Sequence, residues 1–185
     1  ELVIEQADKT EIIVEADDNL QQTIATEVKN GQLIITSESH NNIKEGTRRV
    51  IVKMPVIEEL QASSASTIKS ANTLKGADLT IKTSSAASTD LSVEIDHLTC
   101  QSSSGSSLKI KGLAMNLETE ASSGSRIKAF KLSANEVTAD ASSGATIQVH
   151  PVVSLKAEAS SGAAIEYNII PKNIEKKTSS GGSVS

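Results

Sequence analysis

The side chains most capable of chemistry are four acidic residues that fall at repeating polar positions: Glu118, Glu120, Asp140 and Glu158. Residues at such positions on neighbouring strands of a sheet lie about 4.8 Å apart. Carboxylates at that distance repel each other unless a cation or a lysine compensates them. The pattern therefore allows two interpretations. One is a face that binds Ca²⁺ or a basic ligand; the other is a solvated acidic face relieved by Lys82, Lys156 and Lys177.

Serine, histidine and cysteine do not combine into a nucleophilic site. Ser-Ser pairs recur along the chain, but no histidine or lysine recurs at a fixed offset that could activate a serine. Of the histidines His40, His97 and His150, the last two are expected in return loops, far apart in coil number. Cys100, the single cysteine, is expected at an inward-facing small position as a buried, inert thiol. We predict no catalytic residues, no bound cofactor, and no metal ligands outside the acidic face.

The composition argues against two classes of function. Aromatic residues make up 1% of the chain, so the rings that line sugar clefts or stack on bases are scarce. A formal charge of −5 and a pI near 5.3 argue against nucleic acid, which needs clustered basic side chains. Carbohydrate-active enzymes built on β-helices cluster acidic and basic side chains in one cleft. Here the only arginines are Arg48, Arg49 and Arg126, the first two in a predicted polar loop.

The chain shows no segment for membrane insertion or export. No apolar run approaches the roughly 18 residues that span a membrane, and no basic stretch precedes an apolar one as in a signal peptide. The chain begins at Glu1 without an initiating Met, and residues 2–4 already have the composition of a strand. We expect a processed or trimmed N-terminus, with any export signal or lipid anchor outside these residues.

The element that must position these side chains is a repeat of two serines and a small residue. It starts at Ser63, Ser84, Ser103, Ser122, Ser142, Ser160 and Ser179, with spacings of 18 to 21 residues. The third residue is Ala65 and Ala86 in the first two copies and then Gly105, Gly124, Gly144, Gly162 and Gly181. Glycine there is expected to supply the positive φ that a sharp bend requires.

The residues around each turn alternate between apolar or small and polar, which is typical of strands with one buried face. Two short strands per repeat, joined by the glycine bend and a loose return, fit one coil of about 19 residues. We therefore predict an all-β fold, a single-stranded right-handed parallel β-helix of about seven coils. One copy is expected to hold two extra residues, Thr89 and Asp90, before Leu91. Tyr167 is expected to pack inward on the last complete coil.

The first 56 residues follow a different pattern, with longer alternating segments at 2–5, 11–15, 23–28, 33–36 and 50–54. Asn30-Gly31 predicts a hairpin, residues 37–49 a polar loop, and Pro55 the end of a strand. We predict one domain over 1–185, in which 1–56 form an N-terminal β layer that caps the stack and 57–185 form the coils. The opposite end, 182–185, has no such cover and is a candidate contact edge.

Several of these segments together resemble one known family. They are NGQLII at 30–35, VIVKMP at 50–55, the serial Ser-Ser-Gly turns, Ile165-Glu166-Tyr167 with Pro171, and the terminal SSGGS. The chain resembles the head GIN domain of putative autotransporter adhesins of Gram-negative bacteria over nearly its whole length. One departure is Asn168, where many members have glycine. The resemblance implies a right-handed β-helix that is exported to the periplasm, the outer membrane surface or the extracellular space.

Architecture and resemblance lead to one expected function and two alternatives. The first is a non-enzymatic, exported surface or periplasmic module that acts in adhesion and binds a surface ligand, either a glycan or a protein. The second is an envelope scaffold that self-associates through its end coils. The third is a carbohydrate-active β-helix enzyme.

Overall fold

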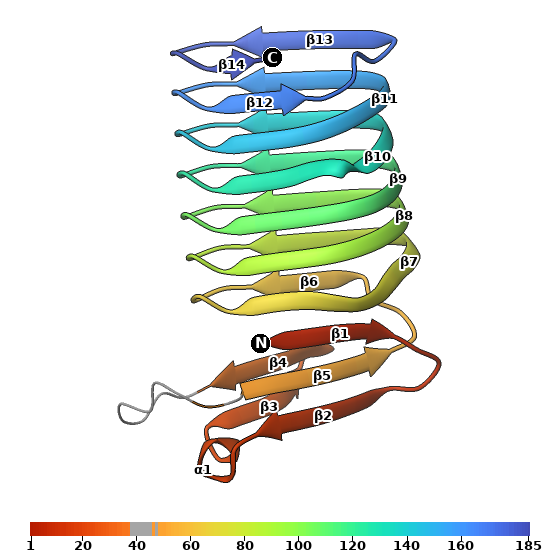
Figure 1. Ribbon diagram of the computed structural model, residues 1–185, viewed down its shortest axis with the longest axis vertical. Helices are drawn as coiled ribbons and strands as arrows, with labels where there is room; N and C mark the ends of the chain where they lie inside the picture. Colours follow the sequence, from red (N-terminus) through yellow and green to blue (C-terminus); the bar gives the residue numbers. More distant parts are fainter. Residues whose placement is uncertain (38–45, 47) are drawn as a thin grey trace.

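The structure, a computed structural model, describes residues 1–37, 46 and 48–185. His40 and most of the predicted polar loop lie outside the described residues. The chain forms a column of stacked coils with the N-terminus near one end and the C-terminus at the other (Figure 1). No described helix is long and apolar enough to cross a membrane.

Each central coil is one long strand that bends around the column and pairs in parallel with the next. These strands are β7 (Thr67–Thr83), β8 (Ser88–Ser102), β9 (Ser107–Ala121), β10 (Arg126–Ala141) and β11 (Thr146–Ala159). Shorter strands complete the two ends of the stack: β6 (Glu59–Ala62), β12 (Ala164–Tyr167), β13 (Asn173–Thr178) and β14 (Ser183–Val184). The first half of each coil runs left to right in front in Figure 1, and the second half returns behind as the chain climbs. The predicted right-handed parallel β-helix is confirmed.

Two details of the predicted coil are wrong. The return between the two halves is not a loose loop, because the strand continues around the corner, so His97 lies in β8 and His150 in β11. There are also no extra residues before Leu91. Thr89 pairs with Ile68 on one side and Leu108 on the other, and its side chain is 1% exposed. Thr89 occupies an inward position that is apolar in the neighbouring coils, so the sequence alternation is broken there although no residue is inserted.

The Ser-Ser-Gly turns have the geometry of type I′ turns. Ser104 and Gly105 have φ of 54° and 68°, and the Ser106 amide donates to the Ser103 carbonyl at 3.2 Å. All seven copies have positive φ at the second and third residues, so the middle serine shares the left-handed conformation predicted for glycine alone. The Gly105 amide also donates to the Ser123 carbonyl of the next coil at 3.0 Å, which links the turns into a ladder.

Inward rows of aliphatic and small side chains fill the column. Leu79, Leu98, Leu117, Val137 and Leu155 form one buried row in register, each at most 2% exposed. Cys100 lies in a second row between Ile81 and Thr119 and is fully buried, as predicted. Near the turns, buried hydroxyls bond from coil to coil: Ser106 Oγ donates to the Thr83 carbonyl at 2.8 Å and Ser125 Oγ to the Ser102 carbonyl at 2.7 Å.

The N-terminal strands cover the first coil. β1 (Leu2–Gln6) lies between β7 and β5 (Arg48–Met54) and is parallel to both, and β5 pairs antiparallel with β2 (Glu11–Ala16). A short helix, α1 (Asp18–Gln21), precedes the hairpin of β3 (Ile24–Lys29) and β4 (Gln32–Ser37). That hairpin turns at Asn30-Gly31 with φ of 52° and 79°, as predicted. Arg48 and Arg49 lie in β5 and not in a loop, because the strand begins earlier than its apolar residues suggested.

Candidate functional site

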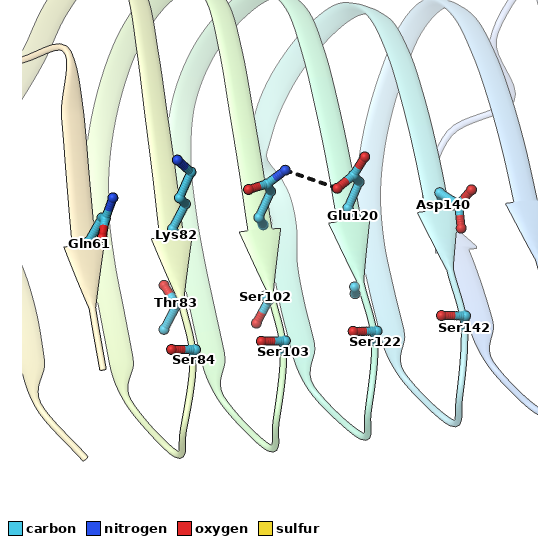
Figure 2. Close-up of a pocket in the computed structure, with 12 residues that line it drawn as sticks. Gln61, Lys82, Thr83, Ser84, Ser102, Ser103, Glu120, Ser122, Asp140 and Ser142 are labelled. Carbon is cyan, nitrogen blue, oxygen red and sulfur yellow. Dashed lines mark hydrogen bonds between the residues drawn. The ribbon is translucent and has the colours of Figure 1, made fainter. Parts of the chain in front are cut away.

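One row of polar side chains runs the length of the column on its rear face, the outward side of the second half of each coil. Its members lie in register on successive strands: Gln61, Lys82, Gln101, Glu120, Asp140, Glu158 and Lys177. We call this set the Glu120 row. Figure 2 shows Gln61, Lys82, Glu120 and Asp140 of this row projecting side by side from parallel strands. The predicted acidic residues Glu120, Asp140 and Glu158 are therefore adjacent, whereas Glu118 lies one row away, between Thr99 and Thr138.

An open groove of about 660 Å³ follows the Glu120 row from Gln61 to Asp140. Its other side is formed by the first serines of the turns, Ser84, Ser103, Ser122 and Ser142 (Figure 2). The groove thus offers hydroxyls, amides, carboxylates and one ammonium group at a repeat of about 4.8 Å. Such a surface can exchange many hydrogen bonds with an extended, polar partner.

The charges at the two ends of the Glu120 row are compensated. Lys177 Nζ lies 3.1 Å from Glu158 Oε1, and this hydrogen bond lowers the pKa of Glu158 below its usual value and raises that of Lys177. At the other end Lys82 Nζ lies 2.7 Å from Glu59 Oε1, and this contact holds the pKa of Glu59 below its ordinary value. Lys156 is a second, looser partner of Glu158, at 3.8 Å.

The centre of the row has no such compensation. Glu120 accepts one hydrogen bond, from Gln101 Nε2 at 3.0 Å (Figure 2). Asp140 and Glu118 form no ion pair or side-chain hydrogen bond with any described residue. The lysines expected to relieve the acidic face therefore pair with Glu59 and Glu158, and leave Glu118, Glu120 and Asp140 available to a partner.

Metal binding has no preformed site in the described part of the chain, where no three His, Cys, Asp or Glu side chains converge. The carboxylates of the Glu120 row project side by side from a sheet instead of surrounding a point. Ca²⁺ binding by this face stays one of the two interpretations that the sequence allows, and calcium titration must decide between them.

The other reactive residues lie apart from one another. His97 Nδ1 lies 2.9 Å from Asn116 Nδ2, and His150 Nδ1 lies 2.7 Å from Asn168 Oδ1 on a different coil. Burial raises the pKa of the Cys100 thiol to about 12. Tyr167 packs against the core as predicted, and its hydroxyl accepts a hydrogen bond from Lys176 Nζ at 2.7 Å.

Sequence reasoning singled out the acidic members of the row but missed its amides, its lysines as members, and the serines beside it. The signal was present, because every member of the Glu120 row stands two residues before a Ser-Ser pair. Sorting the repeat by position instead of by charge would have identified the whole row.

Comparisons with known proteins agree with this architecture. A family model described as putative auto-transporter adhesin, head GIN domain, matches residues 1–171. A putative adhesin from Bacteroides fragilis has a similar structure, with a TM-score of 0.88 and 20% identity over 99% of this chain and 86% of that one. A putative lipid binding protein from Parabacteroides distasonis has a TM-score of 0.78 and 20% identity over 99% of this chain and 87% of that one.

A putative adhesin from Parabacteroides merdae has a TM-score of 0.75 and 19% identity over 99% of this chain and 86% of that one. At these identities the solved structures establish a shared fold. No curated protein matches the chain.

Proposed function

The chain belongs to the family of putative auto-transporter adhesins with the head GIN domain, and we propose from this premise that it is an exported, non-enzymatic adhesion module. Its contact surface is the groove along the Glu120 row. The observation that carries the proposal is the uncompensated centre of that row, where Glu120 and Asp140 lie beside a line of half-buried turn serines that line the groove. The cell surface or periplasm is the expected location.

The architecture favours binding to an extended partner. Parallel coils joined by ladder hydrogen bonds and an aliphatic core form a stiff column, so the groove is preorganised and ordering it costs little entropy on binding. Each coil contributes the same kind of polar contact at the same spacing. Individually weak contacts of this kind add up only for a ligand that spans several coils, such as a glycan chain or an extended protein surface.

The arrangement of reactive groups favours binding over catalysis. No histidine is among the described residues that line the groove, and its one lysine, Lys82, is paired with Glu59. The groove serines therefore have no general base that could activate them. The three arginines are divided between β5 and β10 and do not join the groove. A carbohydrate-active enzyme would need an acid and a base around a bound sugar, and Glu120 and Asp140 lie on one flat face.

Binding of labelled protein to an array of glycans and matrix proteins tests the proposal. We expect a reproducible signal that is lost in the double variant Glu120→Gln, Asp140→Asn, which keeps the shape of the groove but removes its charge. The matched control Glu27→Gln, Asp8→Asn removes the same charge from exposed N-terminal positions and should bind as wild type does. Equal binding by the groove variant and the control would refute the groove as the contact surface.

The same array with and without Ca²⁺ distinguishes a calcium-binding face from a solvated acidic face. Because no described carboxylates converge on one point, calcium titration should shift the melting temperatures of the wild type and of the Glu120→Gln, Asp140→Asn variant by the same amount. A rise that is confined to the wild type would place a calcium ion on this face.

A further inference from the structure

Charges are sorted by position along β9 and β10. The first halves of these two strands carry Lys109, Lys111, Arg126, Lys128 and Lys131 and no acidic residue. The second halves carry Glu118, Glu120, Glu136 and Asp140 and no basic residue. The two halves lie on opposite sides of the column (Figure 1). The same two coils therefore present a basic patch, formed by the first group, on the front face and an acidic patch, formed by the second, on the rear face.

The side chains of both patches are exposed, and most lack a partner of opposite charge. Lys109 is bonded to Asp90 at 2.7 Å, while the other four cations of the basic patch form no ion pair with any described residue. The acidic patch forms no ion pair among the described residues either, and its one side-chain hydrogen bond is that from Gln101 to Glu120. Each patch is thus available to a surface of opposite charge.

The two patches share one spacing because both belong to β-sheets. Lys109 and Lys128 are register partners on neighbouring strands, as are Glu120 and Asp140 on the rear face. Each pair is about 4.8 Å apart, and alternate residues along a strand are about 6.6 Å apart. Arg126 and Glu120 also flank the same turn, so both patches begin at the same edge of the column. On β9, Glu118 and Glu120 alternate along the strand as Lys109 and Lys111 do, so these cations and anions share the spacing along the strand as well as the spacing across it.

We propose that the partner of the rear face is a second copy of this chain, whose basic patch lies on the acidic patch of the first. This inference rests on the proposed function, because it takes the rear face as the contact surface and names its occupant. A shift of one copy along the sheet normal is enough to bring the two patches together. The contact is heterologous, since front meets rear, and it leaves one basic and one acidic patch free for further copies.

The expected strength is that of a weak, reversible contact. The two patches alone, on two coils and about six residues wide, cover roughly 190 Å² per partner. The whole flat face, about six coils tall, covers roughly 570 Å² per partner, which is near the lower limit for specific interfaces. Copies displayed on opposing cells would gain from many such contacts at once. Exposed ion pairs are screened by salt, so self-association should weaken strongly as ionic strength rises.

The test uses two charge-reversal variants in sedimentation velocity experiments. The front variant Arg126→Glu, Lys128→Glu lowers the formal charge of the basic patch from +5 to +1, and the rear variant Glu120→Lys, Asp140→Lys changes that of the acidic patch from −4 to 0. We expect the wild type to self-associate at about 20 mM salt, with the association constant at least about tenfold lower at 500 mM. Each variant alone should be monomeric, and an equimolar mixture of the two should associate again.

Matched controls carry the same charge changes away from both patches. Lys9→Glu, Lys29→Glu corresponds to the front variant and Asp8→Lys, Glu27→Lys to the rear variant, all at exposed positions; both should associate like the wild type. Three results would overturn the inference: a monomeric wild type at all concentrations, self-association that survives both reversals, as contact through end coils would, and a mixture of variants that stays monomeric.

The outcome separates this inference from the proposed function. If the array shows a ligand that depends on the groove while the wild type stays monomeric, adhesion stands and the second copy is the wrong partner. If wild-type-coated beads clump, beads coated with either variant do not, and mixed beads clump again, the adhesion is between copies even when the array is blank.

Discussion

Exchanging glycine and alanine at the turns tests the account of the coil with a single methyl group. Gly105 has a φ of 68°, and a Cβ built there meets no atom within 4 Å. Gly105→Ala therefore introduces no clash, and its cost is conformational. An alanine in the left-handed region costs about 1–2 kcal/mol, and the stiffer unfolded chain returns about 0.4–1 kcal/mol. We expect a net loss of stability of about 1 kcal/mol.

The reverse exchange and a second glycine complete the series. Ala86 has a φ of 61° in the same turn position, so Ala86→Gly should stabilise the protein by up to about 1 kcal/mol. Gly112 differs, because a Cβ there would lie 1.9 Å from the Val93 carbonyl oxygen at a φ of 123°. The backbone at Val93 or at residue 112 must move to make room for this Cβ, so Gly112→Ala should lower the free energy of unfolding by more than about 3 kcal/mol.

Urea unfolding followed by circular dichroism measures the three variants, with a constant slope as the check that the unfolded states are comparable. The expected order of stability is Ala86→Gly, wild type, Gly105→Ala and then, far below, Gly112→Ala. Equal losses for Gly105→Ala and Gly112→Ala would refute the conclusion that turn glycines are selected by φ alone. So would a loss of stability in Ala86→Gly.

Three further predictions follow from the core and from the ends of the Glu120 row. Because burial raises the pKa of Cys100 to about 12, a disulfide reagent at pH 8 should label the thiol only as fast as the protein unfolds; rapid labelling of folded protein would contradict this burial. Ser125→Ala removes one donor to the Ser102 carbonyl, but the Ser122 amide still donates to it. Urea unfolding should therefore show that the free energy of unfolding falls by about 1 kcal/mol; a fall several times larger would contradict this reasoning. Lys177 lowers the pKa of Glu158, so this pair stabilises the folded state above the ordinary glutamate pKa and loses that effect as the pH falls through the lowered value. Lys177→Met should therefore reduce the acid sensitivity of the melting temperature over that window, and an unchanged pH profile would contradict the coupling.

The repeat made most of this fold predictable. Serial Ser-Ser-Gly turns fixed the length of the coil, the alternation around them fixed which residues point inward, and Asn30-Gly31 marked the hairpin. The sequence pattern does not indicate the left-handed middle serine, because positive φ is expected of glycine and not of serine. A type I′ turn places two successive residues there, and Ser104 occupies the first position of the pair.

The corners and the site were harder to predict for a physical reason. Loop-like residues at the return, such as His97 and Gly112, remain in a strand because ladder hydrogen bonds to both neighbouring coils override local propensity. The acidic residues were recognised, but the pairing of Lys82 with Glu59 depends on which side chains the register brings together. The charge difference between the two faces of β9 and β10 cannot be recognised from the sequence alone. It requires knowing that each strand bends at its middle, which places its basic first half and its acidic second half on opposite sides of the column.

Cell adhesion is the most direct test of the central claim, that this column is an adhesion module whose rear face contacts the front face of another copy. Cells that carry the chain on their surface would be compared with cells that carry the rear variant Glu120→Lys, Asp140→Lys or its control Asp8→Lys, Glu27→Lys, at equal surface levels. We expect wild-type and control cells to settle and adhere together and rear-variant cells to stay dispersed. Equal adhesion by all three, or none beyond that of cells without the chain, would contradict the account.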